Sequence, residues 1–231
     1  MSRVRTIALT RREKANALSA ELVESLIAQV EAAHAEGVEV LAFRGEGRNL
    51  SAGFDFGGYE AEAEDALVQR FVRIETLLQA IARSPALTVG FAHGRNFGAG
   101  VDLFAACKWR VAAPGTTFRM PGLAFGLVLG TRRFAAIVGR EAARSILESL
   151  ATFDAERALE MGFATAIAEP DAWNVVLDAA VATVEKLGPG REALYRVLAG
   201  DTDDADMRDL VRSASAPGLK ARIAKYLAAA R

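Results

Sequence analysis

The sequence contains a single cysteine, Cys107, in 231 residues. One cysteine cannot form a disulfide within the chain, and it cannot provide the paired thiolates of a structural zinc site. This favours a reducing compartment, so we expect a cytoplasmic protein. The N-terminus lacks an apolar signal segment, and no apolar run is long enough to span a bilayer. We therefore expect a soluble protein with no membrane partner.

The sequence also lacks an excess of either positive or negative charge. The 28 Lys and Arg residues nearly balance 29 Asp and Glu residues, for a net charge of −1, and the cations do not gather into a basic block. Nucleic-acid binding needs concentrated positive charge, so we expect no nucleic-acid partner. Hydrophobic residues make up 52% of the chain, which is typical of a globular protein and excludes a disordered one.

Apolar patterns predict strands that alternate with helices in the first half of the chain, and mostly helices in the second. Strands are expected at 4–10, 38–44, 87–92, 109–113 and 117–120. Ser19 is expected to cap the first helix, and an amphipathic second helix with apolar residues from 67 to 81 ends before Pro85. Further helices are expected at 131–138, 142–150, 154–161, 172–187 and 218–230. The pattern predicts an α/β core followed by a helical C-terminal part.

Two glycine-rich loops follow predicted strands, GEGRNLSAGFDFGG at 45–58 and HGRNFGAGVD at 93–102. Neither fits a nucleotide-binding loop, because the glycine spacing is wrong for GxGxxG and Val101 stands where a Walker loop needs lysine. Loops at the ends of neighbouring strands can lie side by side and present backbone N–H groups to a developing oxyanion. Two ordinary tight turns are the alternative interpretation.

Several stretches, taken in order, resemble the crotonase superfamily, the enoyl-CoA hydratase and isomerase group. They are REKANALS (12–19), GRNLSAGFD (47–55), GAGVDLFAAC (98–107), FRMPGLAFGL (118–127) and the later helices from 139 to 164. The resemblance implies a spiral of ββα turns over residues 1–187 and a C-terminal helical region over 188–231 that assembles homotrimers or homohexamers. It also implies an acyl-CoA thioester as substrate, with no metal or redox cofactor.

The resemblance also implies roles for individual residues. By position, the backbone N–H groups of Phe54 and Ala99 would hold the thioester oxygen, and Asp102 would be a catalytic carboxylate. Each oxyanion donor typically contributes about 3 kcal/mol to such a transition state. The substrate-binding residues would be Lys14, Ala15, Ala52, Gly53, Asp55, Phe56, Gly57, Gly98, Gly100 and Gly122.

Gly122 departs from the family pattern, because the hydratases carry a second glutamate where this chain has Pro121–Gly122. Hydration in this family resembles a two-carboxylate reaction, whereas one carboxylate is enough to shuttle a proton in a double-bond isomerisation. We therefore rank isomerase-like chemistry ahead of hydration, and hydration ahead of thioester hydrolysis. The alternatives are a non-catalytic acyl-CoA-binding or oligomer-forming homologue, and a hydrolase that acts on a diketone.

Other titratable residues receive simpler interpretations. Asp102 lies in the first turn of a predicted helix, where the helix dipole would keep it ionised unless burial raises its pKa. His93 is expected to be a hydrogen-bonded structural residue, and Cys107 a buried small hydrophobe. We expect His34 and Glu75 to be solvated, and the alternative for Glu75 is that it faces the acyl pocket. Three arginines are expected to form surface salt bridges or to meet CoA phosphates: Arg95, Arg132 and Arg133.

Overall fold

The computed structural model describes residues 3–229, which form an α/β fold with two sheets. The larger sheet is parallel, in the order β1-β2-β3-β5-β8. Its strands are β1 (Val4–Leu9), β2 (Val40–Gly45), β3 (Leu87–Ala92), β5 (Trp109–Ala112) and β8 (Ala166–Ile167). The smaller sheet consists of β4 (Arg95–Phe97), β6 (Thr117–Arg119) and β7 (Thr152–Asp154). In it β4 and β6 are parallel, and β7 is antiparallel to β6.

Where the sequence predicts a range for a helix, the observed helix lies close to it. They are α1 (Ala20–Ala35), α2 (Glu64–Ala82), α3 (Ala99–Ala106), α4 (Thr131–Val138), α5 (Arg140–Ser149), α6 (Ala155–Glu160), α7 (Trp173–Leu187), α8 (Gly190–Ala199), α9 (Asp203–Ala214) and α10 (Leu219–Ala229). Short 3₁₀ helices occur at η1 (Arg12–Lys14), η2 (Tyr59–Ala61), η3 (Gly122–Phe125) and η4 (Pro170–Ala172). Ser19 caps α1 as predicted, because its side chain accepts a hydrogen bond from the Leu22 amide at 3.3 Å.

The parallel sheet is covered on both faces, which explains why β3 is buried along its whole length and β2 over its first four residues. On one face, α1, α2 and α3 enclose the main core. On the other face α7 packs over β2 and β3, and the rings of Phe91 and Trp173 stack with their centroids 4.7 Å apart. The sheet therefore holds the loops at its strand ends in fixed positions.

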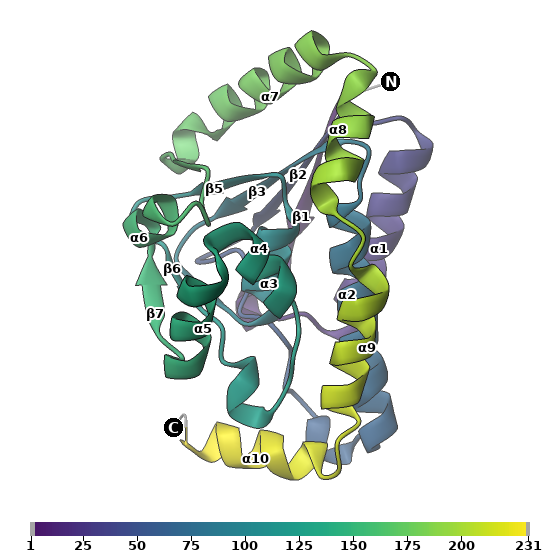
Figure 1. The fold of residues 1–231 in the computed structure, drawn as a ribbon, viewed down its shortest axis with the longest axis vertical. Coiled ribbons are helices and arrows are strands. Elements are labelled where there is room, and N and C mark those ends of the chain that lie inside the picture. The colour runs from purple at the N-terminus through teal and green to yellow at the C-terminus, as the bar shows by residue number, and fades with distance from the viewer. Residues whose placement is uncertain (1–2, 230–231) are drawn as a thin grey trace.

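The C-terminal helices return to this core. Figure 1 shows α8 and α9 following one another along the side formed by α1 and α2, while α10 crosses one end of the molecule. The Gln79 side chain of α2 donates a hydrogen bond to the Asp203 carbonyl at 3.0 Å, at the start of α9. Helices α9 and α10 contribute Leu210 and Ile223 to the main core.

The expected boundary at residue 188 stays a prediction. Within residues 3–229, no helix combines the length and the hydrophobicity needed to cross a membrane.

Candidate active site

The two glycine-rich loops meet at the ends of β2 and β3, as the sequence analysis expects. Asn96 of β4 joins them, because its side-chain oxygen accepts hydrogen bonds from the amides of Leu50 and Ser51 at 3.0 and 3.2 Å. A Cβ atom added to Gly53 would lie 2.4 Å from the Phe97 carbonyl oxygen and 3.3 Å from the Ala99 amide nitrogen. Only a residue without a side chain allows the first loop to approach the start of α3 this closely.

Gly100 allows a second close approach at the same place. A Cβ atom there would lie 2.6 Å from the Ser51 carbonyl oxygen. No hydrogen bond within residues 3–229 has the amide of Phe54 or of Ala99 as its donor. Both residues line one cavity of about 240 Å³. Two amides with unused hydrogen-bonding capacity thus belong to loops that touch each other and border the same space.

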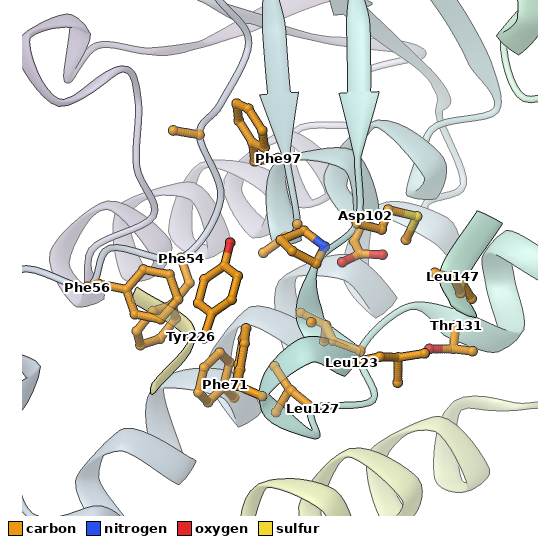
Figure 2. A pocket seen from close by; sticks show the side chains of 18 of the residues that line it. Phe54, Phe56, Phe71, Phe97, Asp102, Leu123, Leu127, Thr131, Leu147 and Tyr226 are labelled. Carbon is orange, nitrogen blue, oxygen red and sulfur yellow. The ribbon is translucent and has the colours of Figure 1, made fainter. Parts of the chain in front are cut away.

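This cavity is strongly apolar and aromatic (Figure 2). Phe54 stacks on Phe71 with ring centroids 4.2 Å apart and meets Phe56 edge-on at 5.0 Å. Among the described residues that line the cavity, three have polar side chains: Asp102, Thr131 and Tyr226. The cavity is also lined by Ala52, Phe97, Gly98, Met120, Pro121, Gly122, Leu123, Phe125, Leu127, Leu129, Leu147 and Leu227.

Asp102 projects from α3 into this cavity and is 3% exposed. Its Oδ1 atom is buried without a hydrogen-bond partner. Burial raises the pKa of Asp102 well above its usual value, the charge of Arg133 opposes this rise, and the charge of Glu75 adds to it. The sequence analysis expects ionisation unless burial raises the pKa, and Asp102 is buried, so the second case applies.

Glu75 of α2 is buried, with a side chain that is 1% exposed, so the expectation that it is solvated is wrong. It accepts hydrogen bonds from Arg133 of α4 and from Gln79, each at 3.2 Å. Burial raises the pKa of Glu75, and Arg133 opposes the rise. The sequence places Glu75 beside the apolar stripe of its helix, and the covering helix α9 that buries it lies more than 120 residues later.

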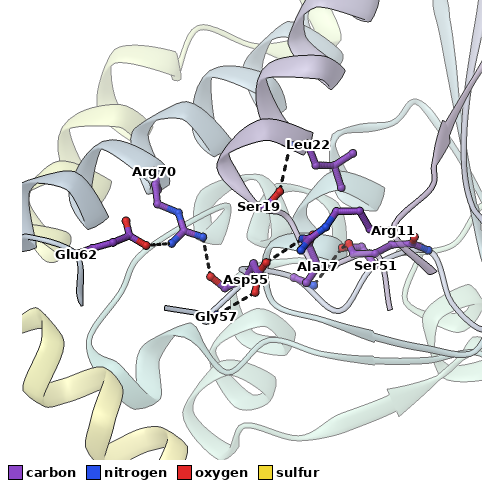
Figure 3. A network of polar contacts seen from close by, with 11 residues as sticks. Arg11, Ala17, Ser19, Leu22, Ser51, Asp55, Gly57, Glu62 and Arg70 are labelled. Atoms are coloured by element: carbon purple, nitrogen blue, oxygen red, sulfur yellow. Dashed lines mark hydrogen bonds and ion pairs between the residues drawn. The ribbon is translucent and has the colours of Figure 1, made fainter. Parts of the chain in front are cut away.

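Internal polar contacts fix the turn that carries Phe54 (Figure 3). The Asp55 carboxylate accepts hydrogen bonds from the Gly57 amide and from Arg11, both at 2.9 Å. Burial opposes ionisation of Asp55, but these two donors hold its pKa below the usual value. Arg70 donates to the Asp55 carbonyl oxygen at 2.6 Å, and its guanidinium lies 4.3 Å from the centre of the Phe54 ring. Asp55 and Gly57 thus hold the turn in shape and do not line the cavity.

The remaining predicted binding residues differ in where they lie relative to the cavity. Gly98 and Gly122 line it, whereas Lys14 is exposed on η1 at the surface. Ala15 accepts a hydrogen bond from the Ala52 amide at 2.9 Å, which ties the 12–19 segment to the first glycine loop. A Cβ atom on Gly122 would lie 3.2 Å from the Leu127 carbonyl oxygen, so a side chain there would be crowded.

Sequence reasoning did not identify the contribution of α10. Tyr226 and Leu227 of this helix line the cavity, and the Tyr226 ring packs against Phe125 with centroids 5.2 Å apart. Figure 2 shows the Tyr226 hydroxyl extending away from its helix toward the middle of the cavity. The position of Tyr226 depends on the long-range packing of α10 against η3, and no local sequence motif predicts that packing.

The two histidines and the other singled-out residues lie outside the cavity. His93 is a structural residue, whose Nε2–H donates a hydrogen bond to the Gly47 carbonyl oxygen at 2.9 Å. His34 is half-buried against the Ser84 hydroxyl at 2.8 Å, so its expected full solvation is wrong. Cys107 is buried as predicted. Arg132 forms the expected surface pairs, with Asp206 and Asp209.

Among residues 3–229 there is no cluster of His, Cys, Asp and Glu that could hold a metal ion. The cavity instead offers unpaired amides, one buried carboxylic acid and an apolar wall. Such a set suits a reaction that builds negative charge on a carbonyl oxygen and moves one proton.

Comparisons with known proteins agree with the fold and the motifs. The family model for enoyl-CoA hydratase/isomerase matches residues 1–216. A probable enoyl-CoA hydratase of Mycobacterium tuberculosis, echA6, is 35% identical over 178 residues, which are 74% of this chain and 70% of that protein.

Two solved structures place the chain in the same fold. A proposed enoyl-CoA hydratase/isomerase from Bordetella parapertussis has a TM-score of 0.96 and 57% identity, covering 99% of this chain and 96% of that one. An enoyl-CoA hydratase from Bacillus halodurans has a TM-score of 0.84 over 97% of both chains, and at 22% identity it shows the fold alone. The chain belongs to the enoyl-CoA hydratase/isomerase family and has the crotonase fold.

Proposed function

We propose that this protein is an acyl-CoA enzyme that isomerises the double bond of an enoyl thioester with Asp102 as its single acid–base group. The observation that carries the proposal is the buried Asp102 carboxyl, which shares one cavity with the unpaired amides of Phe54 and Ala99. Family membership supports the acyl-CoA substrate.

In this reaction the Asp102 carboxylate removes a proton from the carbon next to the thioester carbonyl. The electron pair of that C–H bond moves toward the carbonyl and leaves negative charge on the thioester oxygen. The amides of Phe54 and Ala99 donate hydrogen bonds to this oxygen and stabilise the enolate. Asp102 then delivers the proton to the far carbon of the original double bond, while the enolate electrons form the new double bond beside the thioester and restore its carbonyl. This step also restores the Asp102 carboxylate.

The absence of a second acid supports isomerisation over hydration. Addition of water requires one group to orient the water and another to move a proton. Among the cavity-lining residues that the structure describes, Asp102 is the only carboxylic acid, and crowding around Gly122 leaves little room for another. A proton that leaves one carbon and returns to another needs only one such group.

The aromatic and leucine side chains of the cavity favour an acyl group without charged substituents.

Assembly into a homotrimer or homohexamer stays a prediction, and its support is the apolar surface of α8. There Leu194, Val197 and Leu198 are 42%, 75% and 75% exposed. Sedimentation or light scattering of the full chain measures the assembly directly.

The test is turnover of a panel of 2-enoyl-CoA, 3-enoyl-CoA and β-ketoacyl-CoA substrates by the wild type and by Asp102→Asn. We expect double-bond migration in 3-enoyl-CoA, a loss of about 10²–10⁴-fold in Asp102→Asn, and nearly unchanged acyl-CoA binding. Turnover that does not depend on Asp102 would contradict the proposal. Acyl-CoA binding without any turnover would favour the non-catalytic homologue.

A further inference from the structure

We propose that Glu75 and Arg133 are positioning residues, which set the charge of Asp102 through one buried network of two carboxylates and one guanidinium. The inference rests on the proposed role of Asp102. It assigns a function to a pair of residues that lies outside the cavity itself.

The geometry starts with an incomplete ion pair. One arm of the Arg133 guanidinium, Nη2, lies 3.2 Å from Glu75 Oε1. The other arm, Nη1, is buried and has no hydrogen-bond partner. The Glu75 Oε2 and Asp102 Oδ1 atoms are also buried without a partner. A guanidinium can donate to a carboxylate from each of its arms. In this pair, one guanidinium arm and one carboxylate oxygen have no partner.

The three groups come from three helices that pack together. Asp102 lies in α3, Glu75 in α2 and Arg133 in α4, and α3 contacts both of the other helices. The charge of Arg133 favours the Asp102 carboxylate, and the charge of Glu75 opposes it. A buried acid responds strongly to a nearby cation or anion, because the surroundings screen charge weakly.

Two further charged groups, Asp206 and Arg132, lie near the network. Asp206 of α9 acts on Glu75 by its negative charge, and Arg132 pairs with Asp206 at 2.8 Å. The cavity residues from α5 and η3 are uncharged. Within the part of the chain that the structure describes, Glu75 and Arg133 are thus the charges that act on Asp102.

The network makes a prediction that a purely structural ion pair does not make. Neutralising Glu75 removes a negative charge near Asp102 and leaves Arg133 free to favour the Asp102 carboxylate. Neutralising Arg133 removes the favourable charge. The two substitutions therefore shift the titration of Asp102 in opposite directions, although both disturb the same ion pair.

The experiment follows the carboxyl-carbon NMR resonance of Asp102 as the pH is changed, assigned by its loss in Asp102→Asn. We expect Glu75→Gln to lower the titration midpoint by about one pH unit and Arg133→Gln to raise it by a similar amount. Arg133→Gln leaves Glu75 buried without a cation and is expected to fold poorly. The double variant Glu75→Gln/Arg133→Gln carries no unpaired charge. Its midpoint is expected to lie above that of Glu75→Gln, because the two proteins differ only in the Arg133 guanidinium.

Arg73→Gln is the matched control, because Arg73 lies on the same helix as Glu75 in an exposed pair with Glu24. It is expected to leave the midpoint unchanged. A Glu75→Gln midpoint that does not fall, or a double-variant midpoint that does not lie above that of Glu75→Gln, would overturn the network.

Kinetics separate this inference from the proposed function. The acid limb of kcat/KM for 3-enoyl-CoA is expected to follow the NMR midpoints in each variant. Opposite NMR shifts without Asp102-dependent turnover support the network and contradict the proposed reaction. Asp102-dependent turnover with a fixed NMR midpoint supports the reaction and contradicts the network.

Discussion

Gly130, the residue that precedes α4, lies directly against the carboxylate of Asp102. A Cβ atom on Gly130 would be 2.0 Å from Asp102 Oδ1, and the backbone of Gly130 has a φ of +62°. Both the space and the conformation require glycine. The position of the acid therefore depends on a glycine 28 residues later in the chain.

Gly130→Ala is expected to displace the Asp102 carboxyl and to strain the backbone. We expect the unfolding free energy to fall by about 1–3 kcal/mol, because an L-residue must adopt a left-handed conformation. Displacement by about 1 Å would reduce kcat by about 10²-fold. Gly37→Ala is the control, since its φ of +69° is similar and nothing lies within 4 Å of a Cβ there. Equal loss of kcat in both variants would contradict the special role of Gly130.

The pH dependence of stability gives a second test of Asp102. Because burial raises its pKa in the folded state, folding favours the protonated form. The stability that Asp102 contributes is complete below the usual aspartate pKa and is lost as the pH rises through the raised pKa. We expect Asp102→Asn, which stays neutral, to gain unfolding free energy relative to wild type as the pH rises. A difference between the two proteins that stays constant from pH 4 to 9 in chemical denaturation would contradict a buried, shifted Asp102.

Gly53→Ala tests the contact between the two glycine loops. The added Cβ would collide with the Phe97 carbonyl oxygen and push the Phe54 turn away from Ala99. We expect kcat to fall by about 10²–10³-fold, the cost of losing one oxyanion donor. Gly58→Ala lies in the same loop with a φ of +74° and open space around it, and it is expected to retain activity. Full activity in Gly53→Ala would show that the contact is unnecessary.

Substitution of Tyr226 distinguishes a mechanism in which Asp102 alone moves the proton from one in which Tyr226 is a second proton donor. Burial raises the pKa of Tyr226, so its phenol stays protonated at neutral pH. Tyr226→Phe keeps the ring packing against Phe125 and is expected to change kcat by less than about threefold, because the proposed reaction uses one acid. Tyr226→Ala is expected to raise KM by opening the cavity wall. A large loss of kcat in Tyr226→Phe, measured in steady-state assays, would make Tyr226 a second proton donor.

The sequence was sufficient for those parts of the fold that local patterns determine. Alternation predicts β1, apolar runs predict β2 and β3, and the Ser19 cap predicts the start of α1. Strand β4 was not predicted, because Asn96 is buried there for its hydrogen bonds to the neighbouring loop and not for hydrophobicity. Such a contact spans more than 40 residues and leaves no periodic signal.

The candidate site was predictable where family motifs mark it and not where packing completes it. The glycine loops identify Phe54, Ala99 and Asp102, which line the same cavity. The burial of Glu75 depends on α4 and α9, and the position of Tyr226 depends on the return of α10 to the core. Those contacts join distant segments, so the local sequence pattern misjudges the exposure of Glu75 and leaves the charge of Asp102 undecided.

A crystal structure with a non-reactive acyl-CoA analogue tests the central claim most directly. We predict that the thioester oxygen lies about 2.7–3.1 Å from the backbone nitrogens of both Phe54 and Ala99, with the acyl chain in the aromatic cavity beside Asp102. A thioester oxygen that contacts only one of these amides, or an acyl chain bound elsewhere on the protein, would contradict the account.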